Sequence, residues 1–299
     1  MKKILITGKS SRVGLCVEQW LSQWPERYQT QLISMRDYTW KNTDFSRFDV
    51  VFHVSGIAHV TLDPSMESLF YRVNRDLTIE TATVAKKAGV KQFIFMSSGI
   101  VYGDSSDVGV PLVIDKNTRP NPANFYGNSK LQAEEGLKKL ENESFKVVII
   151  RSPALYGIGM KSHYNNLSDF AKKHHIFPKV ENQRSMLYNK NLAEFVRLMI
   201  DNEESGTFWP QNREYTSTAG IIKDVAAFHC RRMALIPMPL FVVKLGAKAV
   251  PALKKAFGNF AYDQNMSEYK QEYRLYSYEE SIKEIESSDE QLFVEKKLM

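Results

Sequence analysis

Short apolar runs alternate with helical patterns through the first half of this chain, and that alternation limits its fold more than any other feature. Runs typical of buried strands occupy five segments, at residues 3–7, 31–35, 49–54, 92–97 and 146–151. Helical patterns lie between them, at residues 14–24, 66–88 and 126–141. Strands that are buried on both faces of a parallel sheet lack polar alternation, so this order predicts an α/β fold with helices on both faces of the sheet.

The second half of the chain has a looser pattern, which predicts a smaller lobe assembled from separate segments. We expect the main domain over residues 1–156, with residues 188–203 returning to it. The lobe would comprise mainly residues 157–187 and 204–299 and would bind the substrate. The expected architecture is a Rossmann-type doubly wound parallel sheet with a smaller, discontinuous C-terminal lobe, and its ligands should gather at the carboxyl ends of the strands.

The composition is that of a globular protein, with 43% hydrophobic and 25% charged residues among 299. The net charge of +6 comes from scattered Lys and Arg residues rather than from a basic run. It favours an anionic small molecule, such as a nucleotide diphosphate, and does not indicate nucleic acid as a partner. Two distant cysteines, Cys16 and Cys230, and the lack of a signal peptide pattern lead us to expect a cytoplasmic protein.

Residues 233–257 are rich in Leu, Val, Ala and Pro, which raises the question of a membrane segment. Prolines and lysines interrupt the stretch, at Pro237, Pro239, Lys244, Lys248, Pro251, Lys254 and Lys255. Because a span needs about 20 mostly apolar residues, we expect none here. A helix lying on a membrane surface stays open, and helices of the lobe packed on the sheet are the favoured interpretation.

Tyr126 and Lys130 form the most informative chemical pattern of the chain. Four residues apart on a helix, they share one face, so the ammonium can lie beneath the phenol. A phenol with its ordinary pKa of about 10 is a poor base at neutral pH, and a nearby cation would lower that pKa. We therefore expect Tyr126 to exchange a proton with a substrate alcohol or ketone.

A serine at the end of the strand over residues 92–97 would complete the catalytic set. Ser97 and Ser98 both lie there, where a hydroxyl can bond the same substrate oxygen as Tyr126. Both serines could instead cap the strand end. With the Tyr/Lys pair present, a catalytic serine is the favoured interpretation.

The first strand is followed by a loop that predicts phosphate binding. Gly8 and Gly14 flank it, in a spacing similar to Gly-x-x-Gly-x-x-Gly with Ser11 in place of the middle glycine. Glycines between a strand and a helix let backbone N–H groups meet a pyrophosphate. The Cβ of Ser11 narrows that approach, although its hydroxyl can donate a hydrogen bond.

Several segments together resemble the extended short-chain dehydrogenase/reductases, over residues 1 to about 285. They are the loop above, residues 49–56, 73–74 and 93–98, the Tyr/Lys pair, and residues 148–157, 184–187, 191–193 and 278–282. Within that superfamily the chain is similar to the NAD-dependent nucleotide-sugar epimerase/dehydratase family. The likeness is to UDP-glucose 4-epimerase-like proteins of bacterial surface-polysaccharide pathways.

The resemblance implies a bound NAD or NADP and assigns Lys130 to the nicotinamide ribose. It also favours Ser98, four residues before Tyr102, over Ser97 as the catalytic hydroxyl. The implied cofactor-binding residues are Gly8, Ser10, Ser11, Arg12, Val13, Gly14, Arg36, Ser55, Gly56, Asn74, Tyr126, Lys130 and Pro153. The stretch between residues 35 and 49 is too short for the usual helix–strand–helix excursion, and no clear acid follows the second strand to hold a ribose hydroxyl. Arg12 or Arg36 could accommodate a 2′-phosphate or be surface charges, so NAD and NADP both stay open.

The resemblance also implies a nucleotide-diphosphate sugar, with UDP as the expected nucleotide. The implied substrate-binding residues are Ser98, Tyr126, Asn166, Leu167, Phe177 and Arg184. Asn166 and Leu167 would lie beside the phosphates, Phe177 would border the uracil, and Arg184 would clamp the diphosphate. Ala154 and residues 188–190 depart from the family pattern, which leaves the sugar open. His174 and His175 lack metal-like partners, and we expect no metal site.

The expected activity is that of a UDP-hexose or UDP-N-acetylhexosamine 4-epimerase working through a 4-keto intermediate. A 4-ketosugar reductase that consumes NAD(P)H is the alternative. A dehydratase is disfavoured because Gly99 and Ile100, rather than carboxylic acids, follow Ser98. A non-catalytic dinucleotide-binding regulatory protein is the alternative of another class. Family members commonly pair the helices over residues 66–88 and 126–141 across a two-fold axis, so we expect a homodimer.

Overall fold

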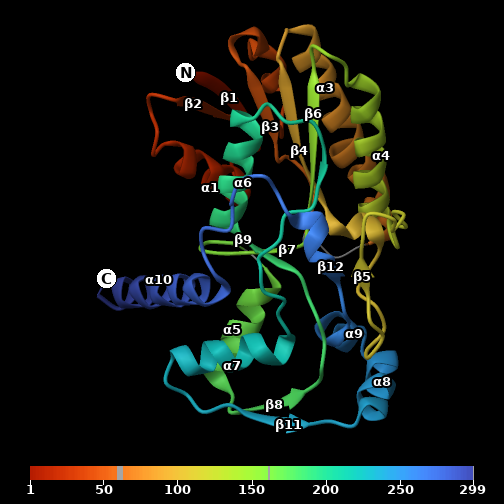
Figure 1. Cartoon of the computed structure of the whole chain (residues 1–299), viewed down its shortest axis with the longest axis vertical. Helices are drawn as coiled ribbons and strands as arrows, with labels where there is room; N and C mark the ends of the chain where they lie inside the picture. The colour runs from red at the N-terminus through yellow and green to blue at the C-terminus, as the bar shows by residue number, and fades with distance from the viewer. Residues whose placement is uncertain (59–62, 161, 299) are drawn as a thin grey trace.

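A six-stranded parallel sheet forms the main domain of the computed structural model, which describes residues 1–58, 63–160 and 162–298 (Figure 1). The strand order is β10-β6-β4-β3-β1-β2. These strands are β1 (Lys2–Thr7), β2 (Tyr28–Ile33), β3 (Val50–His53), β4 (Gln92–Ser98), β6 (Lys146–Ser152) and β10 (Gly206–Phe208). The order reverses between β1 and β3, where sheets of this kind bind their ligands. The predicted fold class is therefore confirmed.

Helices cover both faces of this sheet, and successive strand residues supply the two cores. On one face lie α1 (Arg12–Leu21) and α6 (Asn189–Asp201), and on the other α3 (Leu77–Lys87) and α4 (Phe125–Leu140) (Figure 1). Within β1, Ile4 and Ile6 pack toward α1 and α6, whereas Leu5 packs toward α3 and α4. Because both faces are covered, each strand reads as a continuous apolar run.

The second strand begins earlier than the apolar pattern indicated. Residues 31–35 were the expected strand, but β2 covers Tyr28–Ile33. This strand pairs with β1 alone and forms an edge of the sheet, so Gln29 and Gln31 face solvent. Because the first residues of this edge strand are partly polar, the apolar pattern of the sequence does not mark where the strand begins.

The expected helix over residues 66–88 is interrupted. A 3₁₀ turn (η3, Pro64–Met66) leads into α2 (Glu67–Phe70), a π-helical segment (η4, Tyr71–Asp76) and then α3. Single π turns inside helices commonly mark functional sites. Here the π-helical segment carries Asn74, a residue expected to contribute to the cofactor site.

The connection between β2 and β3 is as short as the sequence indicated. Two 3₁₀ turns, η1 (Tyr38–Asn42) and η2 (Phe45–Arg47), replace a helix–strand–helix excursion. Trp40 and Phe45 are both buried and meet edge to face, with ring centroids 6.2 Å apart. They close this end of the α3/α4 core.

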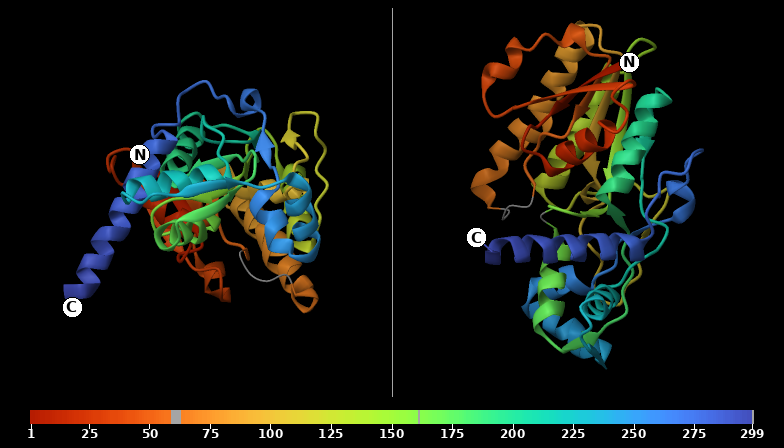
Figure 2. Two further views of the ribbon diagram at one scale, coloured as in Figure 1. Left: turned by 90° about the horizontal axis from the view of Figure 1, so that it is seen from below. Right: turned by 90° about the vertical axis from the view of Figure 1, so that its left-hand side faces the viewer.

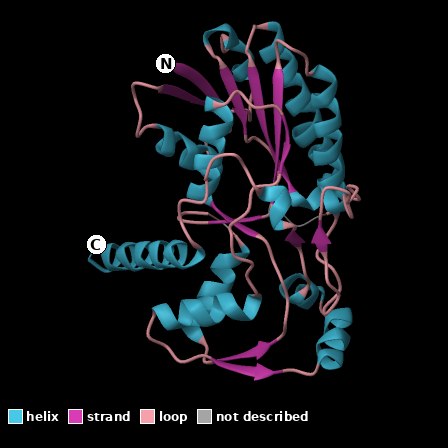
Figure 3. Cartoon of the chain, in the orientation of Figure 1, coloured by secondary structure: helices cyan, strands magenta, loops and turns pink. Residues whose placement is uncertain are grey.

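The smaller lobe lies beyond the carboxyl ends of the strands (Figures 1 and 2). Its helices are α5 (His163–Lys173), α7 (Thr218–Phe228), α8 (Leu240–Ala249) and α9 (Pro251–Phe257), and α10 (Tyr278–Leu298) projects to one side. Three short parallel pairs link its segments: β7 (Ala154–Tyr156) with β9 (Met186–Tyr188), β8 (Ile176–Lys179) with β11 (Ala234–Pro237), and β5 (Val113–Ile114) with β12 (Ala261–Tyr262) (Figure 3). Two further 3₁₀ turns are η5 (Gly99–Tyr102) and η6 (Gln264–Ser267).

Two features bear on the expected division of the chain. Strand β10 comes from the stretch assigned mainly to the lobe, yet it pairs with β6 in the main sheet. Within the described ranges, no helix combines the length and the apolar character that crossing a bilayer requires.

Candidate functional site

A cleft of about 1820 Å³ separates the carboxyl edge of the sheet from the lobe. Pockets for a single small ligand usually measure about 300–1,000 Å³, so this cleft has room for two ligands side by side. The ends of β1, β3, β4 and β6 line one wall, and Arg184, Lys254 and Lys255 contribute from the lobe.

The start of α4 holds Tyr126 and Lys130 at this cleft. Asn124 caps the helix by accepting a hydrogen bond from the N–H of Gly127 at 3.0 Å. Tyr126 follows in the first turn, and its ring packs edge to face on Phe70 with centroids 5.7 Å apart. One turn later Lys130 donates from Nζ to the carbonyl of Met96 on β4 at 2.9 Å. The cap and the two contacts fix both side chains against the end of β4.

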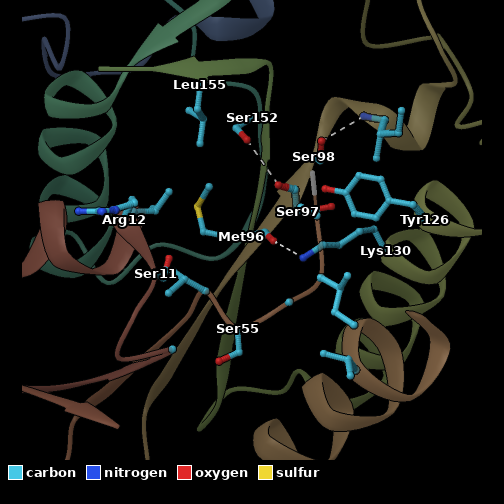
Figure 4. Close-up of a pocket in the computed structure, with 18 of the residues that line it drawn as sticks. Ser11, Arg12, Ser55, Met96, Ser97, Ser98, Tyr126, Lys130, Ser152 and Leu155 are labelled. Atoms are coloured by element: carbon cyan, nitrogen blue, oxygen red, sulfur yellow. Dashed lines mark hydrogen bonds between the residues drawn. The ribbon is translucent and has the colours of Figure 1, made fainter. Parts of the chain in front are cut away.

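The serines at the end of β4 face the tyrosine. Figure 4 shows the Tyr126 hydroxyl pointing toward Ser97 and Ser98. Ser98 Oγ accepts a hydrogen bond from the N–H of Ile100 at 3.3 Å, and its side chain lines the cleft. Ser97 Oγ turns the other way and donates to Glu134 Oε1 at 2.5 Å. The two serines therefore differ in their partners: Ser97 bonds Glu134, whereas the hydrogen bond of Ser98 acts on Tyr126.

Burial is the largest influence on the pKa values of Tyr126 and Lys130. It raises the pKa of Tyr126, and a hydrogen bond from Ser98 opposes that shift more weakly. The expectation that Lys130 would lower the pKa of Tyr126 is therefore wrong for the chain as it stands. Burial instead lowers the pKa of Lys130 to about 8, with the charge of Glu134 acting in the opposite direction. The lysine, rather than the tyrosine, has the pKa nearer neutrality.

A buried ion pair joins α4 to β6. Glu134 accepts from Arg151 Nε at 3.1 Å and from a second guanidinium nitrogen at 2.6 Å. Arg151 also donates to the Tyr102 hydroxyl at 2.7 Å, and both ion-pair side chains are almost fully buried. Sequence reasoning missed this pair, although Tyr126, Lys130 and Glu134 recur at four-residue spacing on one helix face.

The loop after β1 forms a tight cradle. Gly8 has φ +94°, and a Cβ there would lie 3.1 Å from Ser55 Oγ. A Cβ on Gly14 would lie 3.1 Å from both Ile6 and Val54. Ser11 caps α1, with Oγ accepting from the N–H of Gly14 at 3.3 Å. The loop therefore presents the start of α1 to the cleft, as phosphate binding requires.

One buried polar atom of the cradle has no partner. Ser55 Oγ is enclosed and makes no hydrogen bond to any residue that the structure describes, yet Ser55 lines the cleft. A buried hydroxyl without a partner is costly, so a bound polar ligand would satisfy it. This atom and the glycine cradle fit a dinucleotide lying along the edge of the sheet.

Asn74 positions the cradle without lining it. Its Oδ1 accepts from the N–H of Ile57 at 2.8 Å, and its Nδ2 donates to the Ile57 carbonyl and to Ser129 Oγ, both at 3.2 Å. Gly56 lies between, where a Cβ would be 3.0 Å from Asn74 Oδ1 and 3.3 Å from Lys130 Nζ. The π-helical segment thus connects the loop after β3 to the helix that carries Lys130.

The far end of the cradle carries a guanidinium. Arg36 donates to Ser10 Oγ at 3.3 Å, and both residues line the cleft together with Arg12, Tyr38 and Trp40. The nearby Asp37 carboxylate is occupied by its own turn, since it caps η1 and accepts from the N–H of Thr39 at 3.0 Å. This end therefore offers a cation rather than a free carboxylate.

The lobe brings some of the expected substrate residues to the cleft and not others. Arg184 lines it and donates to the carbonyls of Lys255 at 2.5 Å and of Ala256 at 3.5 Å. Leu167 and Phe177 are buried in the lobe core, and Asn166 is exposed on α5. These three residues lie outside the described lining of the cleft.

Most of the expected cofactor residues do meet there. The lining includes Gly8, Ser10, Ser11, Arg12, Val13, Arg36, Ser55, Gly56, Tyr126, Lys130 and Pro153. Gly14 and Asn74 are buried behind it. Lys254 and Lys255 of α9 line the cleft as well, and sequence reasoning did not select them. The two lysines are adjacent in the sequence, but only the folded chain brings them to the same cleft as Arg184.

The chain is similar in sequence to curated proteins of known activity. The chain is 32% identical to a UDP-glucose 4-epimerase of Vibrio cholerae over 67% of its length, which covers 62% of that relative. It is also 32% identical to the N-acetyl-alpha-D-glucosaminyl-diphospho-ditrans,octacis-undecaprenol 4-epimerase of Escherichia coli O157:H7, over 59% of this chain and 53% of the relative. The matched regions thus span between half and two thirds of these relatives.

A solved structure shows the same fold. A dTDP-4-dehydrorhamnose reductase of Clostridium acetobutylicum superimposes with a TM-score of 0.75 at 19% identity, covering 96% of this chain and 99% of the other. The family model for the NAD dependent epimerase/dehydratase family matches residues 21–209, more than half of the chain. The chain is therefore a member of the NAD dependent epimerase/dehydratase family.

Proposed function

We propose that this protein is an NAD(P)-dependent 4-epimerase of a diphosphate-linked hexose, with UDP-hexose or UDP-N-acetylhexosamine as the first candidate substrates. The observation that carries the proposal is the meeting of Ser98, Tyr126 and Lys130 beside a glycine cradle, in a cleft that has room for two ligands. The Vibrio cholerae relative, a UDP-glucose 4-epimerase, supports the reaction type.

The cradle residues would hold the dinucleotide. Gly8, Ser11 and Gly14 shape the loop that would meet the pyrophosphate, and Ser55 Oγ would gain a hydrogen-bond partner. Lys130 would bind the nicotinamide ribose, as the family resemblance implies; it lines the cleft, with its ammonium 2.9 Å from the Met96 carbonyl. When bound, the nicotinamide supplies a hydride acceptor and donor at the sugar carbon.

Tyr126 and Ser98 would transfer and stabilise the proton of the sugar 4-hydroxyl. Tyr126 takes it from the sugar 4-hydroxyl and returns it after the 4-keto sugar has rotated, while Ser98 shares the hydrogen bond to the same oxygen. Because burial raises the pKa of Tyr126, removal of its proton depends on the hydrogen bond from Ser98, which works against that shift.

A 4-ketosugar reductase is the nearest alternative reaction. It uses the same residues, and the structural likeness to a dTDP-4-dehydrorhamnose reductase keeps it open. A dehydratase is disfavoured, because a Cβ on Gly99 would lie 2.6 Å from the Tyr262 hydroxyl and 2.8 Å from the Phe260 ring. A catalytic carboxylate does not fit directly after Ser98.

A lipid-linked diphosphate sugar is a second candidate substrate. Phe177, expected to border a uracil, is buried among the side chains of the lobe core. The cleft nonetheless keeps a basic end, formed by Arg184, Lys254 and Lys255, that suits a diphosphate. The Escherichia coli relative acts, by its name, on an undecaprenol-linked diphospho-N-acetylglucosamine.

The test is a direct assay of the purified protein with NAD and each candidate sugar. Epimerisation at C4 should appear by NMR, whereas a reductase should consume NADPH with a 4-keto sugar. Tyr126→Phe should lower turnover at least about a hundredfold and leave dinucleotide affinity nearly unchanged. Tyr269→Phe is the matched control, since that hydroxyl bonds Glu204 outside the cleft. Turnover above half of wild type in Tyr126→Phe would exclude the tyrosine mechanism, and no turnover on any sugar would favour the regulatory alternative.

A further inference from the structure

The far end of the lobe presents a group of exposed apolar side chains. They lie at the end of β11 and along α8 and are Ile236, Met238, Leu240, Phe241, Val242 and Leu245, which we call the α8 surface. Phe241 is 73% exposed and Leu245 69%. Large contiguous apolar patches are uncommon on free globular proteins and usually mark an interaction site.

The helix geometry separates an anchored side from an outward side. Val243 points inward and is 6% exposed, and Leu240 lies over Gly109, where a Cβ would be 2.7 Å from its side chain. Phe241 and Leu245 are four residues apart and therefore share the outward face. The packing of α8 on the lobe leaves its two largest outward side chains uncovered.

Lysines flank this apolar face. Lys244 and Lys248 are also four residues apart and exposed, on the side of α8 next to Phe241 and Leu245. Together with Lys254 they lower the pKa of the Asp107 carboxylate, the hydrogen bond of Lys254 at 2.7 Å being the largest influence. These three lysines outnumber that carboxylate and give the α8 end of the surface a positive charge.

We propose that the α8 surface docks on an anionic lipid bilayer. An amphipathic helix with large apolar residues outward and lysines beside them can lie in the membrane interface, with the apolar side chains among the lipid chains and the ammonium groups at the phosphates. The positive charge complements anionic headgroups. Because α8 has ten residues, the binding should be reversible and sensitive to salt.

The docked surface adjoins the basic end of the cleft. Helix α9 follows α8 directly, packs against it, and carries Lys254 and Lys255 into the cleft lining (Figure 1). A seven-residue helix is only about 10 Å long, so the cleft opens close to the docked bilayer. This arrangement suits a substrate whose diphosphate is anchored in the membrane, a point that rests on the proposed function.

Vesicle co-sedimentation tests the proposal. The full chain should bind vesicles of phosphatidylethanolamine and phosphatidylglycerol, bind pure phosphatidylcholine at least tenfold more weakly, and lose anionic binding as salt rises. Phe241→Ser combined with Leu245→Ser should weaken anionic binding at least tenfold. Lys244→Gln combined with Lys248→Gln should weaken it several-fold and reduce its dependence on salt.

Matched controls come from elsewhere on the surface. Leu275→Ser replaces another exposed leucine, 50% accessible, and Lys116→Gln with Lys223→Gln removes two exposed lysines outside the α8 surface. Both should bind vesicles like wild type. Thermal unfolding of every variant should confirm that the fold is kept.

Three outcomes would overturn the proposal. The first is failure of the wild type to bind anionic vesicles. The second is vesicle binding by the Phe241/Leu245 double variant as strong as that of the wild type. The third is light scattering that shows an oligomeric wild type and a monomeric double variant while vesicle binding persists. The last result would identify the α8 surface as a contact between copies of the chain. Turnover of a water-soluble UDP-sugar should be equal in the double variant and wild type. Lack of turnover in all proteins would count against the proposed function alone, because vesicle binding is measured separately.

Discussion

Lys130 and Glu134 lie one turn apart on the buried face of α4, and the carboxylate of Glu134 acts on the charge of Lys130. Burial lowers the pKa of Lys130, and the carboxylate of Glu134 works against that change. Glu134 is itself held by Ser97 and by the forked guanidinium of Arg151. Ser97, Lys130 and Arg151, near the end of β6, thus all interact with one buried carboxylate.

Glu134→Gln should strongly destabilise the fold. The change leaves the Arg151 guanidinium, 5% exposed, without its counter-charge, and breaking a buried pair in this way costs about 3–5 kcal/mol. Urea unfolding measures the loss. Glu135→Gln, the exposed neighbour on the same helix, should stay within about 0.5 kcal/mol of wild type. Equal stability of the two variants would mean that the Glu134–Arg151 pair contributes nothing net.

Acid should destabilise the wild type in part through His53. This fully buried ring contacts Thr7 Oγ1 at 2.9 Å and Thr78 Oγ1 at 3.1 Å, and burial foremost, then the charge of Lys130, lowers its pKa to about 3. Because the unfolded chain binds a proton near pH 6.5 and the folded chain does not, stability is full above that pH and falls below it.

The His53 contribution can be isolated by substitution. Between pH 7 and pH 5 the free energy of unfolding of wild type should fall about 2 kcal/mol more than that of His53→Gln, which lacks the titrating ring. Urea unfolding at both pH values gives the difference. Parallel pH profiles of the two proteins would show that His53 is protonated in the folded state as readily as in the unfolded state.

Ser11 should tolerate glycine but not leucine. Ser11→Gly loses the cap on α1 at a cost of a few tenths of a kcal/mol and opens the loop to a pyrophosphate, so NAD(P) affinity should hold or rise. Ser11→Leu places a branched side chain in the cleft and should abolish binding. Calorimetric titration of both variants with NAD and NADP decides this, with unfolding measured alongside to separate loss of the cap. Unchanged affinity in Ser11→Leu would mean that the loop does not cradle phosphate.

Arg184 should bind the diphosphate of the substrate. Arg184→Ala should raise KM about ten- to a hundredfold with a smaller effect on kcat, because a charged hydrogen bond is worth about 1.5–3 kcal/mol and acts before and during reaction. Paired titrations with UDP and with NAD(P) should show weaker UDP binding and nearly unchanged dinucleotide binding. Arg213→Ala is the control, since that arginine is exposed and pairs with Glu272. Equal UDP binding by Arg184→Ala and wild type would limit Arg184 to holding α9.

The homodimer stays a prediction. In the single chain, the large apolar side chains of the described parts of α3 and α4 are at least partly covered, and Gly136 lets the two helices approach closely at Ile79. Six of the exposed large apolar residues lie instead on the α8 surface. Light scattering at micromolar concentration would measure the oligomeric state.

Local sequence determined the parallel sheet and the expected Ser/Tyr/Lys group. Five apolar runs specified the strands around the switch point, and Tyr126 and Lys130 were identifiable because helical spacing alone sets which side chains share a face. Ser98 was expected from its place at the end of an apolar run and from the family resemblance. These features depend on residues within a few positions of one another, so they can be predicted from the sequence alone.

Tertiary structure decided what depends on distant segments meeting. Strand β10 is three residues long and exists because it pairs with β6, and the Glu134–Arg151 pair joins a helix to a strand. The lobe turns Phe177 into its core, although an apolar residue at that position suits a binding site equally well. Burial then raised the pKa of Tyr126 and lowered that of Lys130, because desolvation depends on everything packed around a group and not on its neighbours in sequence.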